Sequence, residues 1–256
     1  MNRTLNFAKR NLLEISRDVL SYIFCVAFPI VMLVIMTLVN SSIPKEAGMT
    51  IFRIDNLTGG IIIFGQTFVM LFTAINLAKD RGGSFLIRLF ATPMKSSDFT
   101  NGYIIPMILV AFVQAVISLI AAIIIALIVG TEIKLLGFLL VLAAMIPSAF
   151  MFVAIGIIFG TLFNEKAAPG LCSIIISLGS FIGGIWFDVE GAGGVMYKIS
   201  KSLPFFYCTK AVRSAIKLDL TWDTFGLPII IVSASAIVLS ILAVFCFKKR
   251  MKADLA

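Results

Sequence analysis

Two long apolar runs of this 256-residue sequence are joined by a short polar stretch, which reads Lys79-Asp80-Arg81-Gly82-Gly83-Ser84-Phe85-Leu86-Ile87-Arg88-Leu89-Phe90-Ala91-Thr92-Pro93-Met94. The apolar runs, 59–78 and 103–129, are each long enough to cross a bilayer as a helix, which takes about 20 residues. Up to Asp98, the polar stretch carries four basic residues and two acids. Because an excess of Lys and Arg beside apolar spans is typical of the cytoplasmic side, the sequence predicts a cytoplasmic loop between two transmembrane helices.

The middle of this loop has the pattern of a short helix. Two glycines break the incoming span, Ser84 is suited to an N-cap, and Pro93 disfavours extension beyond 85–90. That segment is apolar except for Arg88. Such a helix could float on the lipid interface or pack into a groove of a cytoplasmic partner, and the residues alone favour neither.

The residues of this loop resemble a motif of a known protein family. The pattern acidic-Arg-Gly-x5-Arg-x3-Thr-Pro, placed after a second span, resembles the first cytoplasmic loop of permease subunits of type-2 ABC exporters. The resemblance implies that the loop is a coupling helix, which docks on a separate cytoplasmic ATPase subunit. It implies a coupling role for Asp80, Arg81, Phe85, Leu86, Arg88, Leu89, Phe90 and Pro93.

Two later segments carry the same resemblance. Asn164-Glu165-Lys166 is similar to the family's short second cytoplasmic turn. The segments 183–187, 203–207 and 211–213 resemble its Gly-rich span end, a Leu-Pro turn and a following helix with Arg. By this resemblance, short external helices precede the last span.

The composition excludes a soluble domain. Hydrophobic residues make up 60% of the chain, charged residues make up 13%, and the mean hydropathy is +1.09. Soluble domains are about half apolar, so this is the composition of an integral membrane protein. The net charge of +8 fits basic residues flanking the spans better than it fits a nucleic-acid partner.

We expect one all-α membrane domain over 1–256, with both termini cytoplasmic, in the cell membrane. Before the first span, a stripe of apolar residues predicts an amphipathic helix that lies in the lipid interface. The stripe is formed by Leu5, Ala8, Leu12, Ile15 and Val19. Six transmembrane helices are expected at 20–39, 59–78, 103–129, 135–163, 168–187 and 225–247.

The spans contain no evident source of energy. Every Asp, Glu, Lys and Arg of the chain falls outside the six predicted spans. Ion-coupled transporters, by contrast, usually keep ionisable groups inside the membrane. The sequence lacks a Gly-x4-Gly-Lys-Ser/Thr loop for ATP, so ATP and Mg²⁺ are expected only in a partner ATPase. With no His and four scattered Cys, we expect no catalytic residue, metal site or cofactor in this chain.

Other polar residues allow two interpretations. Lys210, Arg213 and Lys217 share one helical face outside the membrane, which is either a solvated or headgroup-facing side or a rim that attracts anions. Inside the spans, Gln66, Asn76, Gln114 and Ser148 are interpreted as interhelical hydrogen-bonding residues rather than substrate contacts. With so few polar groups inside the spans, the translocation path should be largely apolar, which indicates a hydrophobic or amphipathic cargo.

The preferred hypothesis is a permease that exports a drug, antimicrobial peptide or lipid-like molecule by alternating access. The resemblance implies a dimer with itself or a similar chain, and two copies of the ATPase. The alternative is a channel or sensor subunit without an ATPase partner. A third hypothesis, an intramembrane enzyme, is disfavoured, since the predicted spans contain no paired Asp, His cluster or Ser with a base.

Overall fold

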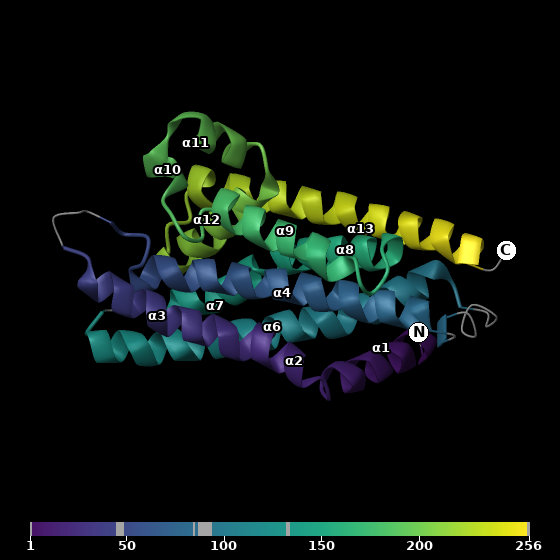
Figure 1. Ribbon diagram of the computed structural model, residues 1–256. Helices are drawn as coiled ribbons and strands as arrows, with labels where there is room; N and C mark the ends of the chain where they lie inside the picture. The colour runs from purple at the N-terminus through teal and green to yellow at the C-terminus, as the bar shows by residue number, and fades with distance from the viewer. Residues whose placement is uncertain (1, 45–48, 84, 87–93, 132–133, 255–256) are drawn as a thin grey trace.

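The computed structural model describes residues 2–44, 49–83, 85–86, 94–131 and 134–254, and every regular element in these ranges is helical. This confirms the predicted all-α class. Both termini lie at one end of an elongated bundle, which we call the terminal end, and the other is the distal end (Figure 1).

Within these ranges, five helical segments are long and apolar enough to cross a membrane, and they match five predicted spans. They are Val19–Ser42 (α2 Val19–Tyr22, η1 Ile23–Ala27, α3 Phe28–Ser42), Ile54–Gly82 (α4), Ser96–Val129 (α6), Leu135–Leu162 (α7 Leu135–Ala144, α8 Ile146–Leu162) and Trp222–Met251 (η3 Trp222–Gly226, then α13 Leu227–Asp254). Shorter helices are α1 (Asn2–Ile15), α9 (Ala168–Ile182), α10 (Val189–Ala192), α11 (Gly194–Lys201) and α12 (Pro204–Lys217).

The span predicted at 168–187 is shorter than expected. Helix α9 has 15 residues, which makes it roughly 22 Å long at about 1.5 Å per residue. A bilayer core is about 30 Å thick. The helix stops at Gly183, and the backbone of Gly184 has a φ of 67°, a left-handed conformation that favours glycine. A sixth crossing by this segment therefore stays a prediction.

Helix α4 is the centre of the bundle. Most of its side chains are buried, and it contacts α3, α6, α8, α9 and α12. Its contact with α8 is closest at Gly156 and Gly160, one turn apart. A Cβ atom on Gly156 would lie 2.5 Å from the Met70 carbonyl oxygen, and one on Gly160 would lie 2.6 Å from that of Ala74. The small residues thus let the two backbones approach closely.

The fourth long segment breaks at Met145, two residues before Pro147, because proline cannot supply the helical N–H. Gln66 of α4 donates from Nε2 to the Met145 carbonyl oxygen at 3.3 Å, and Ser148 donates to Gln66 Oε1 at 2.7 Å. These bonds confirm the interhelical role predicted for Gln66 and Ser148. Gln114, by contrast, donates to Ser118 of its own helix.

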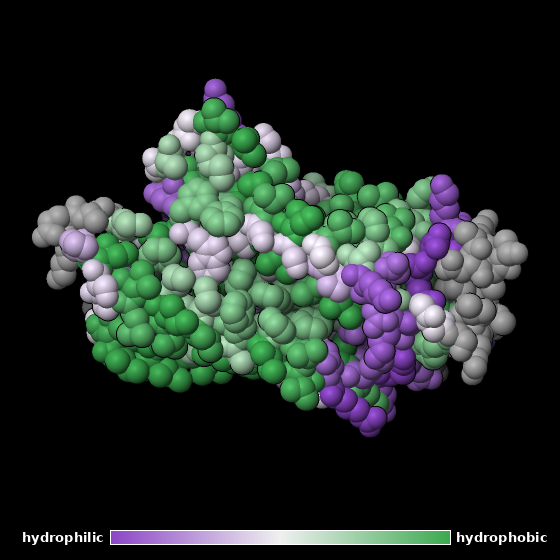
Figure 2. All heavy atoms as spheres, viewed as in Figure 1, coloured by the Kyte–Doolittle hydropathy of each residue, from purple (hydrophilic) through white to green (hydrophobic). Residues whose placement is uncertain are grey.

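The surface has the pattern of a membrane protein. Figure 2 shows hydrophilic side chains gathered at the terminal end and hydrophobic side chains over the visible face between the two ends. Many large apolar side chains of α3, α6 and α13 are exposed. Because these apolar side chains are exposed, the three helices present a surface suited to contact with lipid.

Replacing Gly156 by Ala tests the α4–α8 contact. The added Cβ meets backbone atoms that cannot rotate away, so we expect the free energy of unfolding to fall by about 1–3 kcal/mol. Thermal unfolding in detergent measures the change. Gly170→Ala is the matched control, because nothing lies within 4 Å of its added Cβ. Equal stability of Gly156→Ala and wild type would contradict the close contact.

Candidate functional site

Helix α1 packs along α6 at the terminal end. Its buried side includes Phe7, Ala8, Asn11 and Ile15, and Asn11 donates from Nδ2 to the Gly102 carbonyl oxygen at 3.0 Å. The predicted amphipathic helix is present, but its apolar stripe divides between two environments. Ala8 and Ile15 face the protein, whereas Leu5 and Val19 are 49% and 68% exposed.

A buried carboxylate fixes this helix to the bundle. Asp80, near the end of α4, is 7% exposed. Arg10 of α1 donates to its two oxygens at 2.8 and 3.2 Å, and the Tyr103 hydroxyl of α6 donates to Oδ2 at 2.5 Å. Three hydrogen bonds satisfy the carboxylate, and two of them come from a cation. Asp80 therefore joins α1, α4 and α6.

Arg10 also contacts the start of the loop. Its Cζ lies 4.0 Å from the centre of the Phe85 ring, which stacks on Phe7 with a centroid distance of 6.4 Å. Leu86 is almost fully buried. Partial burial disfavours the charged form of Arg10, but the hydrogen bond and charge of Asp80 outweigh it and raise the guanidinium pKa. The beginning of the loop is thus attached to α1 through a permanent cation.

The neighbouring Arg81 points to another helix. Its Nη1 donates to the carbonyl oxygens of Gly160, at 3.0 Å, and of Thr161, both in the last turn of α8. Helix ends leave such carbonyls without partners and favour a cation beside them. Asp80 and Arg81 consequently join the end of α4, where the loop begins, to different helices, the first to α1 and α6 and the second to α8.

An open groove of about 520 Å³ lies beside Arg81. The exposed turn Asn164-Glu165-Lys166 forms one wall, and Arg250 of α13 also lines the groove. Asn164 Oδ1 accepts from the Ala167 N–H at 2.9 Å, which fixes the turn before α9. The structure therefore brings together Arg81 and the second predicted turn. Of the other predicted coupling residues, Arg88, Leu89, Phe90 and Pro93 lie outside the described residues.

The predicted basic face of Lys210, Arg213 and Lys217 lies at the distal end, where Arg213 stabilises the fold. Arg213 of α12 donates to the carbonyl oxygens of Asn56, Gly184 and Ile185, at 2.9, 2.8 and 3.3 Å. It fits there because Gly59 and Gly60 of α4 leave room. Burial lowers the pKa of the Arg213 guanidinium to about 10, so it remains a cation at neutral pH.

The other two basic residues differ in exposure. Lys210 forms an ion pair with Glu190 of α10 at 2.7 Å, and Lys217 is exposed. The three residues share a face of α12 as predicted, but only Lys217 among them has no hydrogen bond or ion pair within the described part of the chain.

These features define a multi-pass, all-helical membrane protein whose terminal end joins a loop to three helices. The sequence matches the family model described as ABC-2 type transporter over residues 4–217, so the chain belongs to this family. It is the permease component of an ABC transporter, which confirms the resemblance found in the loop. A comparison with curated proteins finds no significant match.

Sequence reasoning missed several residues of the terminal end. Arg10 was interpreted only as a positive charge flanking a span, and Tyr103 as the first residue of one. The spacing of Arg10 and Glu14, which form an i,i+4 ion pair at 2.7 Å, was an available signal for an ordered face. No spacing rule could have paired Arg10 with Asp80, 70 positions away.

Asp80→Asn tests the buried carboxylate. The amide keeps the shape but loses the charge that Arg10 and Tyr103 bind, so we expect unfolding to require about 1.5–3 kcal/mol less free energy. Chemical denaturation of the purified protein measures this, with Asp223→Asn at an exposed position as control. If both variants unfold like wild type, the Asp80 network does not stabilise the fold.

Proposed function

We propose that the chain is the permease subunit of an ATP-driven exporter, energised by a separate ATPase that docks at the terminal end. The observation that supports this most is that the end of α4, where the loop begins, is held to other helices through both Asp80 and Arg81. A loop that only linked two spans would need no such contacts. The exposed turn Asn164-Glu165-Lys166 and its groove offer a second docking surface beside the loop.

The contacts support a mechanism. A force applied to the loop reaches α1 through Arg10, and α1 leads through Asp18, the N-cap of α2, into the first span. The same force reaches α8 through Arg81. Movement of the ATPase would thus shift helices on two sides of α4, and this shift would alternate access to the cargo path.

The family resemblance supports a wider assembly. We infer two ATPase copies, which bind ATP and Mg²⁺, and a second permease chain, identical or similar, in the cell membrane with the termini in the cytoplasm. A hydrophobic or amphipathic cargo, such as a drug, antimicrobial peptide or lipid-like molecule, is supported by Gln66 and Ser148. Both make hydrogen bonds within the protein instead of facing a polar path.

Co-purification with the native cytosol tests the docking. The loop variant Leu89→Asp/Phe90→Asp should recover at least about tenfold less ATPase activity than wild type, because it puts charge on an apolar docking segment. The matched control is Val195→Asp/Ile199→Asp, which alters two exposed residues of α11 at the distal end.

Two results would count against the proposal. Equal recovery by the loop variant and wild type would show that the loop is not the docking element. Recovery of no ATPase by any form, with all forms folded, would favour the channel or sensor hypothesis, which needs no ATPase partner.

Arg10→Ala separates docking from coupling. It should retain the ATPase, since the apolar docking residues Leu89 and Phe90 are unchanged, but lose most ATP-dependent uptake of an amphipathic dye into inside-out vesicles. Arg10→Lys, which keeps the charge, should retain part of it. Undiminished uptake by Arg10→Ala would exclude transmission through α1, and ATP-independent uptake by wild type would exclude a pump.

A further inference from the structure

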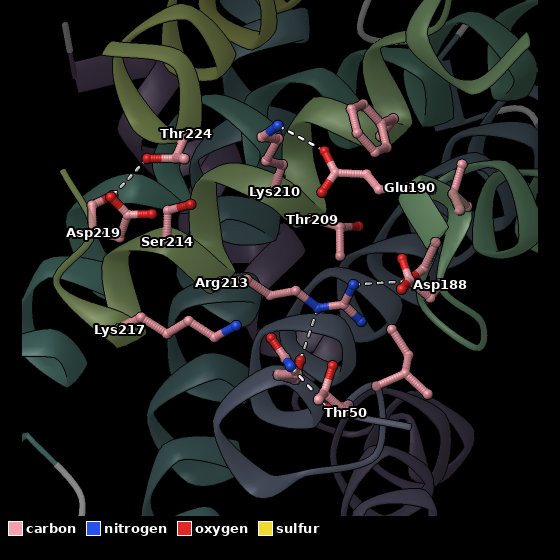
Figure 3. A pocket seen from close by; sticks show the side chains of 16 residues that line it. Thr50, Asp188, Glu190, Thr209, Lys210, Arg213, Ser214, Lys217, Asp219 and Thr224 are labelled. Carbon is pink, nitrogen blue, oxygen red and sulfur yellow. Dashed lines mark hydrogen bonds and ion pairs between the residues drawn. The ribbon is translucent and has the colours of Figure 1, made fainter. Parts of the chain in front are cut away.

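A polar cavity of about 280 Å³ lies at the distal end. Figure 3 shows its lining side chains, which come from α12, from the start of α4 and from the turn that leads into α10. Cavities that bind drug-sized ligands measure about 300–1,000 Å³ and are mainly apolar. This cavity is smaller and polar, so it suits a ligand of the size of an amino acid or a lipid headgroup.

The cationic wall belongs to α12. Arg213 uses its described hydrogen bonds on backbone carbonyls, and Lys210 is held by Glu190. Lys217 lines the cavity, its side chain lies beside that of Arg213 in Figure 3, and no carboxylate in the described ranges lies within ion-pair distance of its ammonium. It is the side chain that an anionic group entering the cavity would meet.

Two anionic groups come from the start of α10, where Asp188 is the N-cap and Glu190 lies in the first turn. Glu190 binds Lys210 through Oε1, and its second oxygen is turned toward Thr209 in Figure 3. Asp188 accepts from the Gly191 N–H through Oδ1 alone. Each carboxylate thus retains an oxygen that can accept a further bond.

The charges of the lining balance. Three cations, Lys210, Arg213 and Lys217, face three carboxylates, those of Asp188, Glu190 and Asp219. A cavity with no net charge does not concentrate anions, which argues against a simple anion-attracting rim. Asp219 follows Lys217 by two positions, whereas Asp188 and Glu190 come from the start of α10, so the described lining offers a free cation and carboxylates of another element to a ligand that carries both charges.

We propose that this cavity binds a small zwitterion with an anionic phosphate or carboxylate group and an ammonium group. The anionic group binds Lys217, and the ammonium binds Asp188 and Glu190. Ile51, Val189 and Phe206 line the cavity and contact the short carbon chain between the charges. Free phosphoethanolamine and the phosphatidylethanolamine headgroup share this chemistry. The site goes beyond the proposed transport function and needs no ATPase.

Isothermal titration calorimetry of the purified full chain in detergent tests the site. The probes are O-phosphoethanolamine, inorganic phosphate and ethanolamine, and we expect the first to bind at least tenfold more tightly than either of the others. Lys217→Gln should weaken phosphoethanolamine binding at least tenfold. Lys198→Gln is the matched control, since Lys198 is an exposed residue of α11 that does not line the cavity.

The outcomes decide the proposal. Phosphate that binds as tightly as phosphoethanolamine, or equal binding by Lys217→Gln and wild type, overturns the zwitterion site. If phosphoethanolamine binds as expected, nanodiscs identify its source. If the lipid headgroup occupies the site, phosphoethanolamine should bind more weakly in phosphatidylethanolamine nanodiscs than in phosphatidylglycerol nanodiscs. If the ligand is soluble, phosphoethanolamine should bind equally well in both. Failure of ATPase docking would not alter any of these results.

Discussion

Two arginines bind the backbone carbonyls that helices leave without partners at their C-terminal ends. A buried carbonyl oxygen without a hydrogen-bond donor costs free energy comparable to a lost hydrogen bond. Arg81 takes carbonyls of the last turn of α8, and Arg213 takes those of Gly184 and Ile185 just beyond α9. The arrangement of the bundle depends on these contacts, because they allow both helices to stop where they do.

Both arginines connect α4 to other parts of the bundle. Arg81 belongs to it, and Arg213 lies against its two glycines, Gly59 and Gly60, while donating to Asn56 in its first turn. The central helix is therefore tied to α8 at the terminal end and to α9 and α12 at the distal end. A movement that displaces one end of α4 is carried along a helix that is buried over most of its length.

The sequence predicted what depends on local pattern. Apolar runs located the five long segments, and the motif at Asp80 and Arg81 located the loop. Which partners these residues bind depends on tertiary packing, so Arg10 could not be paired with Asp80 in advance. Helical spacing likewise placed Arg213 on a face of α12, but it could not reveal that the turn after α9 covers this face. The length of α9 was overestimated because hydropathy continues through Gly183 while the helix does not.

The glycine contact between α4 and α8 has a mechanical meaning. Helices that interlock through large side chains must change rotamers to move past one another, whereas the surfaces at Gly156 and Gly160 are formed by backbone. Small sliding displacements of packed helices are a common form of conformational change. At Gly156 and Gly160, α8 therefore has no side chain that would have to change rotamer if the two helices shifted against each other.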